Sequence, residues 1–219
     1  MNVLILGASG MVGQGVLREC LLDADVTRVV TLGRTPTRQV HPKLHEIVHG
    51  NLLDLSAVED QLSGFDACFY CLGASAARLS EAEYSRINYE MTLSVAETLV
   101  RLNSAMTFVY VSGTGTDSSE RGRVMWARVK GRTENALLRL PFKGAYMLRP
   151  GLIIPMHGVR SKTRLYRVFY TVMMPLLPAL KALFPRAIIT TEQLGRLMLR
   201  LARSGYSKRV LETVDLATL

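Results

Sequence analysis

The stretch that decides the fold is Asn2-Val3-Leu4-Ile5-Leu6, followed directly by Gly7-Ala8-Ser9-Gly10-Met11-Val12-Gly13. The short apolar run is typical of a strand buried on both faces of a parallel sheet. Apolar residues then recur with helical spacing over residues 11–22. A strand, a glycine-rich turn and a helix in this order predict the first unit of a dinucleotide-binding α/β fold.

Each glycine of this loop has a physical reason to be there. Gly7 allows a tight turn, Gly10 lets the backbone approach a pyrophosphate, and Gly13 permits close packing of helix on strand. The free N–H groups and the positive dipole at the helix start would hold the phosphates. The alternative is a tight turn with a purely structural role. The cofactor-binding residues expected from this loop are Gly7, Ser9, Gly10, Met11, Val12 and Gly13.

Further strands and helices alternate along the chain. Strands are expected at residues 26–32, 45–49, 66–70, 107–111 and 145–148, and helices at 55–62, 81–102 and 124–140. This alternation predicts right-handed crossovers and a Rossmann-type, doubly wound parallel sheet. We expect a single domain over residues 1–219, with a dinucleotide-binding core at 1–150 and a small C-terminal substrate or cap region at 151–219.

The late segment 164–185 is unusually apolar. Its longest uncharged run, 168–180, is shorter than the roughly 20 residues that a membrane-spanning helix needs, and Pro175 and Pro178 interrupt it. We expect it to form a helical cap over the active-site cleft or a packed dimer surface. Basic residues ahead of it, from Arg160 to Arg167, leave peripheral membrane contact and homodimer formation open.

Composition narrows the function classes. With 48% hydrophobic and 21% charged residues, the chain has enough apolar surface for a folded core. Its net charge of +9 is compatible with phosphate ligands, but basic residues do not cluster with aromatic ones, so nucleic-acid binding is not expected. No signal peptide is visible. The three cysteines, Cys20, Cys68 and Cys71, do not form a disulfide framework and favour a reducing cytoplasm.

Two patterns that resemble metal or redox motifs are given structural interpretations. Cys68 and Cys71 form a CxxC, but within an apolar run that is more typical of a buried strand. His41, His45 and His49 flank Pro42 and an expected strand, so they would not share one helix face. No metal site is expected.

The residue after the second strand bears on the choice of cofactor. An NAD enzyme usually has Asp or Glu there to accept the ribose 2′-hydroxyl. Here Gly33 is followed by Arg34, which can pair with a 2′-phosphate and stack on adenine. This favours NADP and leaves NAD as the alternative; Arg34 as an ordinary solvated arginine is the other interpretation.

Five motifs in this order and at these separations resemble the atypical short-chain dehydrogenase/reductases. Within them, the sequence is most similar to the Tat-interacting-protein-like oxidoreductases, close to the NAD(P)-dependent epimerase/dehydratase and NmrA-like proteins. The similarity extends over nearly the whole chain, including a helix start at 190–195. The motifs are Gly7 to Gly13, Gly33-Arg34, Cys71-Leu72-Gly73, Val129-Lys130-Gly131 and Arg149-Pro150-Gly151.

The resemblance implies further cofactor contacts. Leu72, Gly73 and Ala74 match the turn that lines the adenine ribose. Asn51, beside Leu52, occupies the place where relatives often hold an Asp near the adenine amine, and its carbonyl oxygen can still accept a hydrogen bond. Pro150 and Gly151 match the loop that contacts the nicotinamide carboxamide.

The catalytic pattern of this superfamily is a Ser or Thr after the fifth strand, then Tyr-x-x-x-Lys on the next helix. The lysine lowers the tyrosine pKa and holds the nicotinamide ribose, so that the tyrosine can move a proton. This chain has Lys130, and Ser112 or Thr114 can supply the hydroxyl, but the tyrosine position holds Trp126. An indole N–H can donate a hydrogen bond but cannot act as a proton shuttle near neutral pH. A proton would have to come from Ser112, Thr114, water, or a tyrosine of the long helix, Tyr84 or Tyr89.

Three functions therefore stay open. The first is an NADP-dependent oxidoreductase acting on a small organic substrate, and the second is a redox-responsive regulator that binds cofactor without turnover. The third is a membrane-peripheral protein that binds a lipid or quinone-like ligand through the segment 164–185.

Overall fold

The computed structural model describes residues 1–77, 79–159 and 188–218. Its main sheet has seven strands in the order β3-β2-β1-β4-β5-β6-β9, and all six pairings are parallel. The order runs outward in both directions from β1 and β4, as in a Rossmann fold. The predicted doubly wound α/β sheet is confirmed. The strands are β1 (Asn2–Leu6), β2 (Arg28–Gly33), β3 (Leu44–Val48), β4 (Ala67–Tyr70), β5 (Thr107–Val111), β6 (Gly144–Arg149) and β9 (Val210–Glu212).

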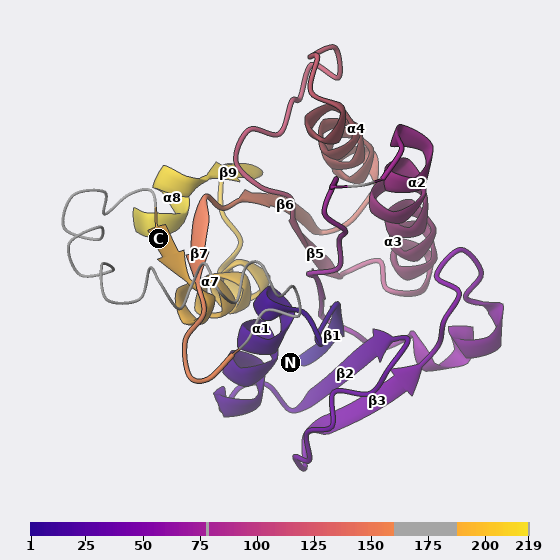
Figure 1. Ribbon diagram of the computed structural model, residues 1–219. Coiled ribbons are helices and arrows are strands. Elements are labelled where there is room, and N and C mark those ends of the chain that lie inside the picture. Colours follow the sequence, from indigo (N-terminus) through magenta and orange to yellow (C-terminus); the bar gives the residue numbers. More distant parts are fainter. Residues whose placement is uncertain (78, 160–187, 219) are drawn as a thin grey trace.

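Helices cover both faces of this sheet (Figure 1). α1 (Met11–Leu22) and α7 (Thr191–Ser204) pack against each other on one face. α2 (Glu81–Ser85), α3 (Met91–Leu102) and α4 (Met125–Arg139) lie on the other. The expected helices at 11–22 and 124–140 agree with α1 and α4 to within one residue at each end.

Alternation along β1 explains why both faces are covered. Val3 and Ile5 belong to the apolar core beneath α1 and α7, whereas Leu4 and Leu6 belong to the core beneath α3 and α4. All four side chains are fully buried. Because successive side chains of a strand point to opposite faces, a run of apolar residues needs helices on both sides.

Two expected helices have a different form in the structure. The segment expected at 55–62 forms a 3₁₀ helix, η1 (Ser56–Gln61), instead of an α-helix. The long helix expected at 81–102 is interrupted by a π-helical turn, η2 (Arg86–Glu90), between α2 and α3. Such turns arise where one extra residue is accommodated in a helix, and they are frequent at functional sites.

The C-terminal region contributes to the main sheet. β7 (Leu152–Ile154) pairs with β8 (Ile188–Thr190) in a small second sheet, and α7 follows with a capping box made by Thr190 and Gln193. β9 then joins the edge of the main sheet beside β6, and α8 (Thr213–Thr218) ends the described chain. The expected cap segment 164–185 lies outside the described residues. Within the described ranges, no helix is long and apolar enough to cross a membrane.

Candidate dinucleotide-binding and active site

The N-terminus of α1 is open to an anion. Its N-cap residue, Gly10, makes no side-chain capping bond, and the first turn has no acidic residue. The first N–H groups of a helix have no partner within the helix, and the helix dipole adds a positive potential there. A pyrophosphate therefore fits this position, because it supplies the missing acceptors and the negative charge.

Two glycines of the loop have no room for a side chain. Gly7 has a φ of +78°, and a Cβ there would lie 2.6 Å from the backbone of Cys71. A Cβ at Gly13 would lie 2.1 Å from the carbonyl oxygen of Gly7. The loop is thus packed between α1 and the end of β4, which keeps its N–H groups at the carboxyl edge of the sheet.

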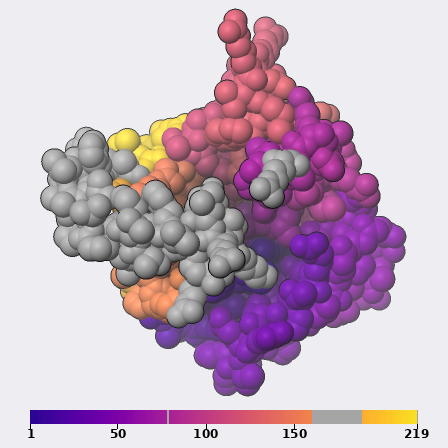
Figure 2. Space-filling view, viewed as in Figure 1, coloured from indigo at the N-terminus to yellow at the C-terminus, as the bar shows by residue number. Residues whose placement is uncertain are grey.

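A cavity of about 620 Å³ opens beside this loop. Figure 2 shows the surface hollowed near the indigo N-terminal segment, between the violet and magenta parts of the chain. The expected cofactor residues Gly7, Ser9, Arg34, Leu52, Leu72, Gly73 and Ala74 are among its lining residues. The structure thus brings together residues from the ends of β1, β2 and β4, which is where open α/β sheets bind ligands.

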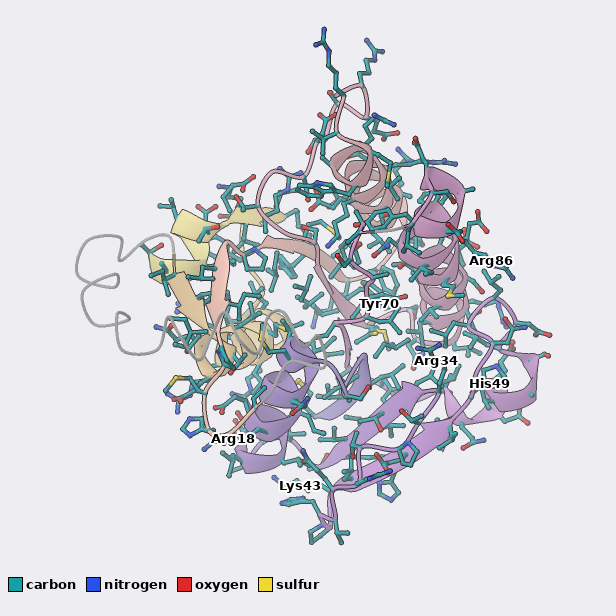
Figure 3. The ribbon with its side chains drawn as sticks, in the orientation of Figure 1. Arg18, Arg34, Lys43, His49, Tyr70 and Arg86 are labelled. Atoms are coloured by element: carbon teal, nitrogen blue, oxygen red, sulfur yellow. The ribbon has the colours of Figure 1, made fainter. Side chains whose placement is uncertain are left out.

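Arg34 lies just beyond the end of β2, facing the α3 side of the cavity (Figure 3). Its side chain is exposed, and within the described part of the chain it has no hydrogen-bond or ion-pair partner. Glu46 of β3 lines the same cavity. Its carboxylate accepts a hydrogen bond from the N–H of Thr37 at 2.6 Å and so holds the loop that follows Arg34. Sequence reasoning missed Glu46, because it examined only the residues directly after β2.

The π-helical turn η2 supports the loop after β4. Asn88 in this turn is buried, and its side-chain oxygen accepts a hydrogen bond from the N–H of Ala74 at 3.2 Å. The backbone oxygen of Asn88 also accepts from the hydroxyl of Thr133 on α4 at 3.0 Å. Asn88 therefore connects the cofactor-lining loop to α4. It was missed because the 81–102 pattern was interpreted only as the apolar face of one regular helix.

The expected catalytic residues gather at the ends of β5 and β6. The N–H groups of Ser112 and Thr114 donate to the carbonyls of Leu148 and Pro150, at 2.8 and 2.9 Å. Lys130 on α4 donates to the carbonyl of Ser112. Burial lowers the pKa of Lys130 to about 8, and the negative charge of Glu134 opposes this shift. A cation, two hydroxyls and the Pro150 loop thus adjoin each other on the second half of the sheet.

A buried ion pair lies directly behind this group. Glu134 on α4 and Arg149 on β6 form two hydrogen bonds of 3.1 Å through the arginine Nε. The Ser112 hydroxyl donates to Glu134 and to the carbonyl of Leu148. Arg149 also donates to Glu212 of β9 at 2.8 Å. The Ser112 hydrogen is therefore committed to the interior of the protein. Sequence reasoning missed this role of Glu134, because nothing in the sequence distinguishes it from the other charged residues of the same helix.

Trp126 occupies the start of α4, one turn before Lys130. Its six-membered ring lies against Gly115, where a Cβ would be 3.3 Å from Cη2 and where φ is +81°. Tyr84 is buried, which raises its pKa to about 12, and the ring of Tyr89 is covered by the Arg132 guanidinium at 4.0 Å.

Asn51 lies at the edge of the cavity but is not among its lining residues in the described chain. Its side-chain oxygen accepts from the N–H of Leu53 at 3.2 Å, and its side chain is exposed. In the CxxC, Cys68 is fully buried in β4, both thiols are free, and burial raises the pKa of Cys71 to about 12.

Comparison with known proteins agrees with this geometry. The model of the NAD dependent epimerase/dehydratase family matches residues 3–120, more than half of the chain. The chain belongs to this family. The expected relationship to atypical short-chain dehydrogenase/reductases is confirmed, since epimerase/dehydratase members, Protein HTATIP2 and short-chain dehydrogenase structures are all similar to it.

Relatives among characterised sequences are distant. Protein FMP52-2, mitochondrial, from Scheffersomyces stipitis is 27% identical over 162 residues, covering 73% of this chain and 68% of that protein. Protein FMP52, mitochondrial, from Chaetomium globosum is 22% identical, with coverages of 69% and 65%. Protein HTATIP2 from Rattus norvegicus is 26% identical, with coverages of 70% and 63%. The match thus spans about two thirds of each relative's length.

These names contradict the expected cytoplasmic localisation, because the FMP52 proteins are mitochondrial by name. The expectation was wrong because free cysteines indicate reducing conditions and say nothing about which compartment provides them.

Solved structures share the fold of this epimerase/dehydratase family member. A short chain dehydrogenase family protein from Francisella tularensis has a TM-score of 0.67 and 16% identity, covering 96% of this chain and 95% of that one. The Bordetella bronchiseptica enzyme WbmF, solved in complex with NAD+, has a TM-score of 0.69 and 18% identity, with coverages of 99% and 76%.

Proposed function

We propose that this protein is an oxidoreductase that uses NADP(H) in preference to NAD(H) and acts on a small organic substrate. The single observation that carries the cofactor preference is Arg34, a cation at the rim of the cavity that has no partner in the described part of the chain. A 2′-phosphate next to the adenosine ribose would give this guanidinium a charge-assisted partner.

Residues on one half of the sheet would bind the adenosine and pyrophosphate of the cofactor, and residues on the other half would bind its nicotinamide end. The open N-terminus of α1 would bind the pyrophosphate, and Leu72, Gly73 and Ala74 would line the adenosine end. Lys130 would hold the nicotinamide ribose, and the loop at Pro150 and Gly151 would orient the carboxamide. When bound, the nicotinamide ring supplies or accepts a hydride.

Titration of the full chain with NADPH and NADH tests this proposal. We expect the wild-type protein to bind NADPH at least tenfold more tightly. Arg34→Ala should weaken NADPH binding about 10- to 100-fold, since one charge-assisted contact contributes about 1.5–3 kcal/mol, and should leave NADH binding unchanged. Arg38→Ala, an exposed arginine of the same loop that does not line the cavity, is the matched control. Equal affinity for both cofactors in all three proteins would reject the preference.

A second candidate, cofactor binding without turnover, is favoured by one observation. The place of the usual proton-donating tyrosine is taken by Trp126, and the neighbouring Ser112 hydroxyl already donates to Glu134. A protein of this kind would bind NADPH and would not transfer its hydride to any acceptor. The same titration, followed by assays of NADPH oxidation with a set of hydride acceptors, distinguishes this candidate from the oxidoreductase. Binding of NADPH without its oxidation by any acceptor would favour the second candidate.

A further inference from the structure

In the proposed function, the nicotinamide lies near Lys130, and the usual tyrosine acid beside it is replaced by Trp126. Reduction of a simple ketone leaves an alkoxide, whose basicity is close to that of hydroxide, so a proton must arrive as the hydride is transferred. The Ser112 hydroxyl donates inward to Glu134 and Leu148, and the Tyr84 hydroxyl is buried. The Thr114 hydroxyl is an aliphatic alcohol, a far weaker acid than a phenol, and the Lys130 ammonium donates to the Ser112 carbonyl. The described residues therefore hold no tyrosine at the place of the usual acid for carbonyl reduction.

The indole of Trp126 takes the position of the usual catalytic tyrosine. Trp126 is half-buried, and its six-membered ring is supported by the backbone at Gly115. No hydrogen-bond partner of its indole N–H lies within the described ranges. Glycine favours this contact, because a Cβ at position 115 would be 3.3 Å from the ring in a backbone conformation that other residues rarely adopt. Ring and loop thus fit each other and leave an apolar, π-rich face on the partly exposed indole.

The ammonium group of Lys130 lies on the same side of α4 as the Trp126 indole. Lys130 follows Trp126 at i+4, so both side chains project from the same side of α4. Its ammonium group donates to the Ser112 carbonyl but is not in an ion pair with any carboxylate of the described chain. Lys130 can therefore stabilise an oxyanion that forms in front of Trp126.

We propose that the substrate of this site is a planar, conjugated hydride acceptor of the quinone type, stacked on Trp126 with its developing oxyanion near Lys130. The inference rests on the proposed function, since it assigns a substrate class to the same site. A quinone suits the site because its reduction gives a phenolate-type anion. Such an anion has a conjugate-acid pKa of about 10, as for the tyrosine phenol, and persists without a positioned acid.

The step balances without a protein acid. The C4–H bond of the dihydronicotinamide breaks, and its hydrogen and electron pair form an O–H bond on one quinone oxygen. The ring becomes the hydroquinone monoanion, with the negative charge on the other oxygen. That oxygen then takes a proton from water. The dinucleotide is oxidised by two electrons, and the quinone is reduced by two.

Trp126 is the only tryptophan of the chain, so the wild-type protein carries its own reporter. Menadione, titrated into the full chain with NADP+ present, should quench this fluorescence saturably, whereas cyclohexanone should not. With NADPH, kcat/KM for menadione should exceed that for cyclohexanone by at least 100-fold. Trp126→Tyr should narrow this ratio at least tenfold, since a phenol can act as the missing acid.

Other outcomes separate the two proposals. Failure to bind either dinucleotide would reject the proposed function and this inference with it. If NADPH binds but quenching by menadione is linear and unsaturable, the quinone assignment is wrong while the cofactor site stands. Saturable quenching without NADPH oxidation, or cyclohexanone reduction as fast as menadione reduction, would also overturn it.

Discussion

The side-chain oxygen of Asn88 accepts a hydrogen bond from the backbone N–H of Ala74, at 3.2 Å. Its amide nitrogen donates to the carbonyl of Tyr84 at 3.1 Å. The interaction places a buried amide in the π-helical turn directly behind the loop that lines the cavity. The turn is thus a support for the site as well as an irregularity in a helix.

Asn88→Ala should weaken NADPH binding as well as stability. The substitution leaves the Ala74 N–H and the Tyr84 carbonyl without their partner, which costs about 1–3 kcal/mol for buried groups. Because the loop is then held less firmly, we expect at least a fivefold increase in the Kd for NADPH. Urea unfolding and fluorescence titration measure the two effects.

Asn103 provides a matched control at the opposite end of the same helix. It is also buried, accepts from the N–H of Phe65 at 2.9 Å and donates to the carbonyl of Leu62 at 2.8 Å. Asn103→Ala should lower the free energy of unfolding by a similar amount and leave the Kd for NADPH unchanged. A similar loss of cofactor affinity in both variants would mean that Asn88 acts only through stability.

The sequence predicted the sheet well because its signals are local. The run at residues 2–6, the glycines that follow and the periodic helices depend on neighbours along the chain, and the structure agrees with them to within a few residues. The π-helical turn at Asn88 could not be found in this way. Its extra residue does not disturb the apolar periodicity of 81–102, and its bond to Ala74 joins segments 14 residues apart.

The candidate site was only partly accessible to the same reasoning. Arg34 was found because it directly follows the second strand, where dinucleotide-binding folds recognise the adenosine ribose. Ala74 was found through the resemblance to the family, whose adenine-ribose turn it matches. Glu46 lies within β3, and its position on the cavity follows from the register that pairs it with Thr31. That register depends on how β2 and β3 pair in the folded protein, so it could not be read from the local sequence. The orientation of the Ser112 hydroxyl toward Glu134 is likewise decided by packing across 22 residues.

Glu46→Gln should change the cofactor preference. Gln can still accept from the Thr37 N–H, so the loop is retained while a negative charge is removed from the cavity. We expect NADPH to bind about 3- to 10-fold more tightly, since a carboxylate disfavours a nearby 2′-phosphate. NADH binding should not change. Glu97→Gln, an exposed position on α3, is the control. Weaker NADH binding by Glu46→Gln would instead make Glu46 the acceptor for the adenosine ribose hydroxyl.

Lys130→Met should stabilise the protein and impair cofactor binding. Burial lowers the folded-state pKa of Lys130 to about 8, whereas an unfolded lysine titrates near 10.4. Between these values the unfolded chain binds more protons at this side chain, so wild-type stability should rise with pH. The gain from Lys130→Met, on the order of 1–2 kcal/mol, should be largest below pH 8 and fade toward pH 10.

Chemical unfolding at several pH values measures this gain. Lys143→Met removes an exposed lysine and should show no such pH dependence. NADPH titration of the same variants should show at least a tenfold loss of affinity for Lys130→Met alone. A gain in stability that does not vary between pH 7 and 10 would contradict a desolvated ammonium group at position 130.

Glu134→Ala should be the most destabilising of these substitutions. It leaves the Arg149 guanidinium, which is 9% exposed, without the carboxylate that both its Nε bonds reach. Loss of one partner of a buried ion pair costs about 3–5 kcal/mol, because the other charge stays buried. Urea unfolding should therefore show a much lower midpoint.

The pair of Glu59 and Arg101 is a suitable comparison, because it is also an arginine–glutamate pair with two hydrogen bonds, of 2.8 and 2.9 Å, but lies on the surface. Glu59→Ala should change the midpoint little, since solvent already screens that pair. The double variant Glu134→Ala/Arg149→Met removes both buried charges and should recover part of the stability lost by Glu134→Ala alone. If the double variant is no more stable than the single one, the loss comes from the cavity left by the glutamate, and the buried charge of Arg149 is not its cause.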